Sequence, residues 1–450
     1  MAVGNGFDLL VTGGRVALPG GLADCDIGIA GGRIVALGAL AGRAAAETVD
    51  ARGLHVLPGV IDTQVHFREP GAEHKEDLAS GSDAAVLGGV TAVFEMPNTK
   101  PVTDSAELLA DKLARAHGRM RCDHAFFVGA TAANAARLAE LERLPGCAGV
   151  KIFMGSSTGS LLVEDDTTLL HVLAAGRRRV AVHSEDEPRL RERKALAAAG
   201  DPSTHPVWRD VEAAVRSTTR LLAAARRAGR PVHVLHISTA DELPLLAAHR
   251  DIATVEATPQ HLTLAAPDCY ARLGTRAQMN PPLRGPEHRE ALWAAVASGL
   301  VDVLGSDHAP HTVAEKEQPY PQSPSGLPGV QTLLPLMLNH VAAGRLSLLR
   351  LVDLTSAGPA RIFGIAGKGR IAQGYDADLV LVDLAARRRV ERSWLASRAG
   401  WSPFEGMELI GWPVATLVRG TFAARDGALV GTPQGRPVRF VDTLAGDKAG

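Results

Sequence analysis

Two patterns of hydrophobic and polar positions divide the chain. Residues 7–57 alternate apolar and polar positions in short runs separated by glycine turns, and the same pattern returns in residues 369–431. Alternation with a period of two predicts strands, and Gly-Gly or Asp-Gly pairs between them predict hairpin turns. We therefore expect residues 1–57 and 368–450 to pair into one small β-sandwich domain.

The region between them, residues 58–367, alternates short apolar runs with longer helical patterns. The apolar runs are 59–67, 91–97, 123–130, 149–154, 180–185, 232–238, 254–259 and 301–309. Residues 104–118, 211–229 and 286–299 carry apolar side chains at the three- and four-residue steps of a helix. Eight strand–helix units within about 300 residues predict an α/β fold, a (β/α)8 TIM-type barrel. An open doubly wound sheet is the main alternative, but no G-x-G-x-x-G loop follows the first run.

Polar and charged residues that could bind a metal or a substrate occur where the predicted apolar strands end. They are Gln64, His66, Arg68, Asn98, Lys151, His183, His236 and Asp307. The carboxyl ends of barrel strands meet at one mouth, so these residues are expected to lie close together. A lone histidine at a strand end is more often structural, but imidazoles and a carboxylate from four strands suit a divalent ion such as zinc or manganese. The candidate metal ligands are His66, His183, His236 and Asp307.

Two interpretations of Lys151 remain open from the residues alone. An ammonium group has no lone pair to offer a metal, so the side chain can simply extend from the strand end towards water. Alternatively, burial and a nearby cation lower its pKa, and the neutral amine adds carbon dioxide. The resulting carbamate is an anionic ligand able to bridge two metal ions.

Composition narrows the class of partner. Lys plus Arg (48) nearly balance Asp plus Glu (49), so we expect a small-molecule substrate and no nucleic acid. Four cysteines without C-x-x-C spacing suit a reducing cytoplasm. The first residues lack the pattern of a signal peptide, and no run of about eighteen apolar residues predicts a membrane span.

The chain resembles the amidohydrolase superfamily and, within it, the dihydroorotase branch. The resemblance is carried by "HFREPG" (66–71), "MPNT" (96–99), "NPPLR" (280–284) and "SDHAPH" (306–311), and it extends over almost the whole chain. It implies a (β/α)8 barrel with a β-sandwich built from both termini. It also implies reversible, metal-dependent hydrolysis of the cyclic amide of dihydroorotate to N-carbamoyl-aspartate, a step of pyrimidine biosynthesis.

The same resemblance implies a metal centre. Lys151 matches a carbamylated lysine that bridges two zinc ions. His183 and His236 match ligands of the more exposed ion, and His66 and Asp307 match ligands of the more buried one. Asp307 is also implied to be the catalytic group that accepts a proton from water and passes it to the departing ring nitrogen.

The resemblance further implies how the substrate is bound. Arg68, Asn98 and His311 match the groups that hold the substrate carboxylate, and a guanidinium suits that role because it can bind both oxygens at once. Asn280 matches a further substrate contact. Similar proteins are usually homodimers, and some that have lost their metal ligands are partners of aspartate transcarbamoylase.

Gln64 departs from the family pattern, which has histidine at that position. An amide oxygen is a far weaker zinc ligand than imidazole. Either the buried site binds a second zinc weakly, or the enzyme uses one zinc held by Lys151, His183 and His236. The alternatives are a noncatalytic partner of aspartate transcarbamoylase and a hydantoinase or allantoinase. Arg68 distinguishes a dihydroorotase from a hydantoinase or allantoinase, because the substrates of those two enzymes lack a ring carboxylate for it to bind.

Overall fold

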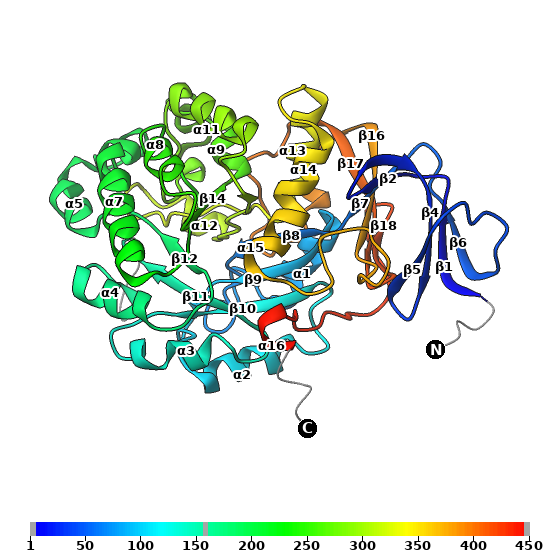
Figure 1. Ribbon diagram of the computed structural model, residues 1–450. Coiled ribbons are helices and arrows are strands. Elements are labelled where there is room, and N and C mark those ends of the chain that lie inside the picture. The colour runs from blue at the N-terminus through cyan, green and yellow to red at the C-terminus, as the bar shows by residue number, and fades with distance from the viewer. Residues whose placement is uncertain (1–5, 156–160, 445–450) are drawn as a thin grey trace.

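A parallel eight-stranded sheet forms the centre of the computed structural model, which describes residues 6–155 and 161–444 (Figure 1). In chain order its strands are β8 (Val60–Val65), β9 (Val90–Glu95), β10 (Asp123–Gly129), β11 (Cys147–Phe153), β12 (Val180–His183), β13 (Val232–Val234), β14 (Ala253–Ala257) and β15 (Val303–Leu304). The sheet curls round on itself, because Val65 forms a β-bridge with His308 and the His66 amide donates to the His308 carbonyl oxygen at 2.7 Å. The predicted (β/α)8 barrel is confirmed.

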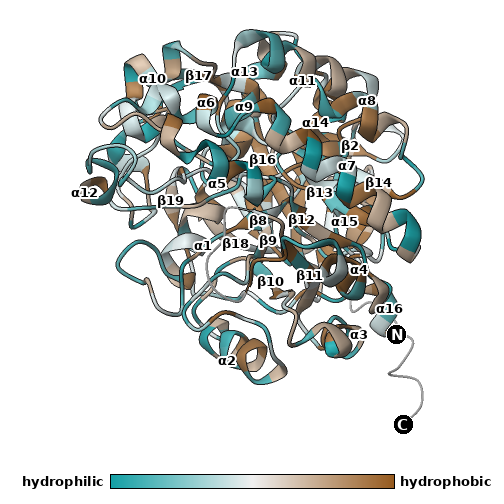
Figure 2. Ribbon diagram, turned by 90° about the vertical axis from the view of Figure 1, so that its left-hand side faces the viewer, coloured by the Kyte–Doolittle hydropathy of each residue, from teal (hydrophilic) through white to brown (hydrophobic). Residues whose placement is uncertain are grey.

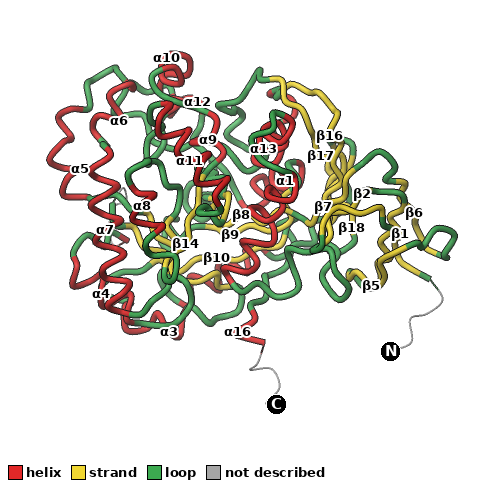
Figure 3. The backbone as a smooth tube through the Cα atoms, turned by 45° about the horizontal axis from the view of Figure 1, so that its top comes forward, coloured by secondary structure: helices red, strands yellow, loops and turns green. Residues whose placement is uncertain are grey.

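Helices cover the outside of the barrel (Figure 3). The main ones are α1 (Leu78–Leu87), α2 (Ala106–Ala116), α4 (Asp166–Ala174), α7 (Val211–Ala228), α8 (Glu242–Ala247), α11 (Pro286–Ser298) and α13 (Leu333–Ala342). The longest, α7, begins where the Asp210 side chain accepts the Ala213 amide and ends at Gly229, whose φ of 64° is left-handed. Figure 2 shows apolar residues gathered on the central strands and polar residues on the outer helices. None of the helices in the described ranges is long and apolar enough to cross a membrane.

Two smaller sheets lie beside the barrel, on the right in Figure 1. One has the strand order β5-β4-β1-β6 and the other β19-β18-β17-β16-β7-β2-β3. Their strands are β1 (Phe7–Thr12), β2 (Arg15–Leu18), β3 (Gly21–Asp24), β4 (Asp26–Ala30), β5 (Arg33–Gly38), β6 (Ala45–Asp50), β7 (His55–Pro58), β16 (Leu379–Arg389), β17 (Glu408–Val418), β18 (Thr421–Arg425) and β19 (Ala428–Leu429). β16 pairs with β7, so the two ends of the chain share a sheet. The domain boundaries 1–57 with 368–450, and 58–367, stay a prediction.

The structure departs from the sequence prediction at two places. Strand β15 has only two residues, where the apolar run 301–309 predicts a longer strand, because the Ser306 amide donates to the Asp62 side chain at 3.0 Å instead of to a strand backbone. The connection between β16 and β17, residues 390–407, leaves its sheet and packs on the barrel through buried Val390, Trp401 and Phe404. We call residues 390–407 the β16–β17 connection.

Three buried carboxylates meet where the C-terminal segment reaches the barrel. Asp123, Asp376 and Asp378 have oxygens close enough together for a metal site, but the Lys368 ammonium lies among them at 2.6, 3.2 and 2.5 Å. Burial opposes the charge on Lys368, and the carboxylates outweigh it and raise its pKa. Arg419 also contacts Asp123. The cluster is therefore an ion-pair network that ties the chain's C-terminal part to the barrel.

Candidate active site at the barrel mouth

All predicted site residues line one cavity of about 600 Å³ at the carboxyl ends of the barrel strands. They are His66, Arg68, Asn98, Lys151, His183, His236, Asn280, Asp307 and His311, and Gln64 lies with them. Residues 321–326, from the long connection after β15, form one wall. The structure thus brings together residues from the ends of β8, β9, β11, β12, β13 and β15 and from the connection after β14. The chemical role of each stays a prediction.

On one side of the cavity, β12 and β13 end in two converging imidazoles. His183 Nδ1 lies 3.0 Å from His236 Nε2. Because the Glu185 carboxylate accepts from His183 Nε2 at 2.8 Å, the proton of His183 sits on Nε2 and the Nδ1 lone pair faces the cavity. Two nitrogens bound to one tetrahedral zinc at about 2.0 Å would be about 3.3 Å apart. The pair therefore fits the geometry of two ligands to one ion.

Glu185 and Arg209 are supporting residues that the sequence analysis missed. Arg209 donates Nε to Glu185 Oε1 at 3.0 Å and Nη2 to Oε2 at 2.5 Å, and both side chains are buried. Burial lowers the pKa of His183 more than Glu185 raises it, so the imidazole is neutral and able to bind a metal. A histidine and a glutamate two positions apart on a strand share one side, and that spacing was the available signal.

On the opposite side, Gln64, His66 and Asp307 form a hydrogen-bonded group. Gln64 Nε2 donates to Asp307 Oδ1 at 3.0 Å, and Gln64 Oε1 has no partner among the described residues. His66 Nδ1 donates to Asn98 Oδ1 at 2.7 Å, which leaves the Nε2 lone pair 3.4 Å from Asp307 Oδ1. A hydrogen-bond donor therefore occupies the place where the family pattern has a metal-binding imidazole.

Lys151 lies at the end of β11 and does not extend to water. Its side chain is 1% exposed, and its Nζ lies 4.5 Å from the centroid of the Phe153 ring. Burial lowers its pKa to about 7, against the opposing effects of Asp307 and Glu256. Near neutral pH much of this lysine is therefore the neutral amine, the form that adds carbon dioxide.

Arg68 and His311 give the cavity a positive wall. Arg68 donates Nε to the Pro310 carbonyl at 3.1 Å, and its Nη2 lies 3.3 Å from His311 Nε2. Within the described part of the chain no carboxylate forms an ion pair with this guanidinium. Burial lowers the Arg68 pKa to about 10, so it stays charged near neutral pH.

His311 is held as a neutral donor. Lys75 Nζ lies 3.1 Å from His311 Nδ1, so that nitrogen accepts, and the proton sits on Nε2, which is 3.0 Å from the Ser325 carbonyl. Burial and the nearby charges of Arg68 and Lys75 lower the His311 pKa. Arg68 thus supplies the positive charge and the free N–H groups of this wall, which suits a carboxylate, while the His311 N–H already has the Ser325 carbonyl as its acceptor.

Asn280 presents its amide nitrogen to the cavity. Its Oδ1 accepts from His205 Nε2 at 3.0 Å, and Tyr320 lies against the other ring nitrogen of His205 at 3.3 Å. This oxygen is therefore already used, and the Nδ2 donors of Asn280 are available to a ligand. His205 is a buried structural histidine that orients the Asn280 amide.

Backbone strain gathers at this mouth. Arg68, His236 and Asp307 have φ values of 64°, 36° and 44°, and they are three of the five non-glycine residues with positive φ among those described. Such conformations cost on the order of 1–3 kcal/mol each and persist where the surrounding structure enforces them, typically at functional sites. A (β/α)8 barrel with converging imidazoles, a desolvated lysine and a carboxylate at its mouth defines the class of amidohydrolases.

Comparisons with known proteins agree with that class. Residues 209–423 match the model of the amidohydrolase family, and residues 53–143 match the dihydro-orotase-like model. A dihydroorotase of Halobacterium salinarum is 41% identical over 421 residues, which cover 92% of this chain and 96% of the relative. An allantoinase of Rubrobacter xylanophilus is 38% identical over 449 residues, with coverage of 97% and 98%. A solved L-hydantoinase from Arthrobacter aurescens has a TM-score of 0.91 at 31% identity, covering 96% of this chain and 99% of that one.

The chain belongs to the amidohydrolase family, in its dihydroorotase-like group. The resemblance inferred from the sequence motifs is confirmed.

Proposed function

We propose that the chain is a dihydroorotase, which hydrolyses the ring amide of dihydroorotate to N-carbamoyl-aspartate and catalyses the reverse ring closure. The observation that carries the proposal is the Arg68 guanidinium, which lines the same cavity as His183 and His236 and has no carboxylate partner among the described residues. Dihydroorotate has a ring amide and a carboxylate. The cavity offers groups suited to the ring amide and to the carboxylate. With hydantoin or allantoin, the Arg68 guanidinium would have no substrate carboxylate to bind.

His183 and His236, together with Lys151 as a carbamate, would hold one zinc ion. The converging ring nitrogens of His183 and His236 and the desolvated Lys151 amine fit such an ion. When bound, a divalent ion polarises the amide carbonyl and lowers the pKa of water. A second zinc at His66 and Asp307 is disfavoured, because Gln64 donates a hydrogen bond there and supplies no imidazole.

The chain's own residues then bind and orient the substrate and move the proton. Arg68 holds the ring carboxylate by charge and N–H donation, His311 lies beside it, and the Asn280 amide donates to the ring. Asp307 accepts a proton from the attacking water and passes it to the departing ring nitrogen. Gln64 donates to Oδ1 of this carboxylate, which leaves Oδ2 for the proton. Ring closure uses the same residues, with the proton transfers reversed.

The noncatalytic alternative is disfavoured by how much of the site is retained. Loss of catalysis would remove the selection for converging imidazoles and a desolvated lysine, yet His183, His236, Lys151 and Asp307 line one cavity. Gln64 is the only departure from the family pattern among the predicted ligands. Hydantoinase or allantoinase activity is the second candidate, since close relatives carry those names.

The first experiment measures turnover of dihydroorotate by protein purified with zinc and bicarbonate, with bound metal counted on the same sample. We expect turnover at about one zinc per chain. Turnover only near two zinc ions would show that the buried position fills despite Gln64. No turnover in either direction, with metal absent, would move the assignment to a noncatalytic partner.

Arg68→Met distinguishes the candidate substrates. Loss of a bidentate, charged contact predicts a fall in kcat/KM for dihydroorotate of roughly 10²-fold or more, given about 1.5–3 kcal/mol per charged hydrogen bond. Turnover of hydantoin by the wild-type chain and the variant is the control, and it should change little. Equal loss on both substrates would sink the carboxylate assignment.

We also propose a cytoplasmic homodimer that can associate with aspartate transcarbamoylase. The four cysteines are free thiols, as expected in a reducing compartment, and the homodimer follows from the family resemblance. Light scattering on the chain alone and on its mixture with aspartate transcarbamoylase tests both assemblies. A monomer that shows no mixed peak would refute them.

A further inference from the structure

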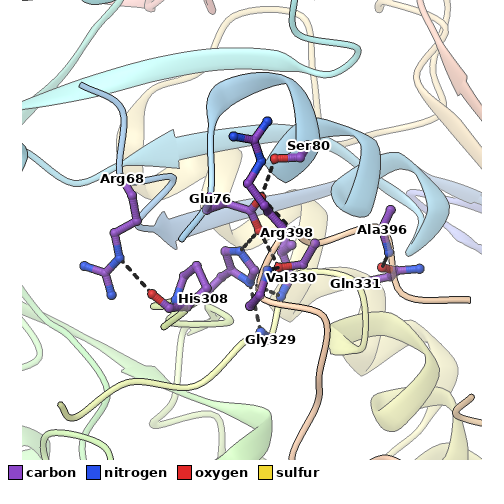
Figure 4. A network of polar contacts seen from close by, with 12 residues as sticks. Arg68, Glu76, Ser80, His308, Gly329, Val330, Gln331, Ala396 and Arg398 are labelled. Carbon is purple, nitrogen blue, oxygen red and sulfur yellow. Dashed lines mark hydrogen bonds and ion pairs between the residues drawn. The ribbon is translucent and has the colours of Figure 1, made fainter. Parts of the chain in front are cut away.

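Glu76 is a fully buried carboxylate that lies next to the cavity but does not line it. Its Oε1 accepts from Ser80 Oγ and from the Arg398 amide at 3.1 Å, and its Oε2 accepts from Ser397 Oγ and from His308 Nε2 at 3.2 Å. Figure 4 shows Ser80, His308 and Arg398 converging on Glu76. Three segments of the chain therefore meet at one side chain: the start of α1, the connection after β15 and the β16–β17 connection.

The His308 ring is fixed at both nitrogens. Its Nδ1 accepts from the Gly329 amide at 3.0 Å and lies 3.4 Å from the Val330 amide, so the proton sits on Nε2 and points at Glu76 (Figure 4). The Phe67 ring packs nearly perpendicular to it, with a centroid separation of 5.6 Å. Without the Glu76 acceptor the ring would keep a buried N–H with no partner, which costs free energy and favours rotation.

The His308 backbone connects two residues of the active site. His308 follows Asp307 directly, and its carbonyl oxygen accepts the His66 amide at 2.7 Å. Asp307 has a left-handed φ of 44°, a conformation that needs its surroundings to hold it. A shift of His308 would therefore move both the Asp307 carboxylate and the end of β8.

We propose that Glu76 is a positioning residue, which fixes His308 and through it the placement of Asp307 and His66, and that Ser397 and Arg398 of the β16–β17 connection complete this support. The inference rests on the proposed function, because Asp307 is the proton carrier in it. The connection holds the mouth at a second point, where Trp401 Nε1 donates to the His311 carbonyl at 2.8 Å. The sheet built from the chain's two ends thus helps to order the site on the barrel.

Glu76→Ala tests the proposal through the split between kcat and KM. Misplacement of a catalytic group by about 1 Å can cost roughly 10²-fold in rate, so we expect kcat for dihydroorotate to fall by about that factor. The KM should rise much less than kcat falls, since Glu76 contacts neither Arg68 nor His311, whose side chains are anchored by the Pro310 and Ser325 carbonyl oxygens. An unchanged kcat in a variant that only melts earlier would overturn the proposal.

A serine pair in the β16–β17 connection supplies the matched control. Ser397→Ala removes one donor to Glu76 and should lower kcat several-fold. Ser393 is exposed, and its hydroxyl donates to the neighbouring Glu391 and not to Glu76, so Ser393→Ala should leave kcat unchanged. Equal effects of the two substitutions would contradict the proposal. Ser397→Ala also keeps the test valid where Glu76→Ala does not fold.

Hydrogen exchange gives a readout that needs no substrate. In Glu76→Ala the amides of residues 61–68 should exchange faster, because the His66 amide bonds to the His308 carbonyl, while those of β12 stay protected. Uniformly faster exchange in both regions would indicate general destabilisation and refute a positioning role. If the wild-type chain shows no turnover, the proposed function fails, and this exchange difference still decides the role of Glu76.

Discussion

The two sides of the barrel mouth differ in the side-chain groups that they offer as metal ligands. At the ends of β12 and β13, His183 Nδ1 and His236 Nε2 face each other at 3.0 Å, and Glu185 holds the outer nitrogen of His183. At the ends of β8 and β15, the Gln64 amide donates to Asp307 Oδ1, so that oxygen already has a partner. Both sides use the same architecture of strand ends.

The difference shows that the scaffold decides where ligands meet, while single side chains decide whether a cation is held there. A (β/α)8 barrel brings any strand-end residue to its mouth. An imidazole with one nitrogen hydrogen-bonded offers the other to a metal, whereas an amide N–H aimed at a carboxylate competes with a metal for it. One residue, Gln64, is enough to make the two sides unequal.

The largest effect should come from the same substitution made on each side. His183→Ala removes a ligand of the proposed zinc, so bound metal should fall to near zero and kcat/KM by roughly 10³-fold or more, about 4 kcal/mol. His66→Ala should leave the metal content near its wild-type value. Metal analysis of both purified variants makes the comparison. Equal metal loss from both would show that the two sides hold the ion jointly.

A smaller effect should follow from loosening the support of His183. Glu185→Gln keeps the size of the side chain but weakens the acceptor for His183 Nε2 and the ion pair with Arg209. Removal of such a supporting contact typically weakens metal affinity by about 10- to 100-fold. Competition with a chelator measures the change. The exposed Glu192→Gln on helix α5 (Glu187–Arg193) is the control, and it should show wild-type affinity.

The smallest effect, a factor of about two in metal content, should come from a substitution that gives the Gln64 side of the mouth a second imidazole. Gln64→His replaces the amide donor with an imidazole beside His66 and Asp307, so bound zinc should rise from about one to about two per chain. Metal counting on protein of known concentration detects this. Exposed Gln318→His is the matched control and should not change the count. Two zinc ions in the wild-type chain would remove the asymmetry altogether.

Much of the fold could be predicted because its signals are local. A run of apolar residues about six long, followed by a helical period, encodes a strand and its crossover helix within one stretch of chain. The eight barrel strands and helices α2, α7 and α11 follow such signals. The β16–β17 connection could not be predicted, since nothing in residues 390–407 indicates that they pack on the barrel.

The sequence predicted which strand-end residues form the candidate site, but not most of the contacts that hold them in place. Glu185 follows His183 by two positions, and that spacing was a usable signal. The contact between Ser397 and Glu76 joins residues 321 positions apart, and no local pattern encodes it. Arg209, which completes the support of His183, lies 24 positions beyond Glu185 in the short connection that precedes α7, so the spacing does not reveal their contact.

The sequence alone determined the barrel, the candidate ligands and the departure at Gln64, because residue identity and short-range periodicity are sufficient for those. The tertiary structure decided which nitrogen of His183 faces the cavity, that the Gln64 amide donates to Asp307, and that Lys151 is buried. The physical reason is that hydrogen bonding is directional and burial is collective. Both depend on how distant segments pack, and neither is a property of any one segment.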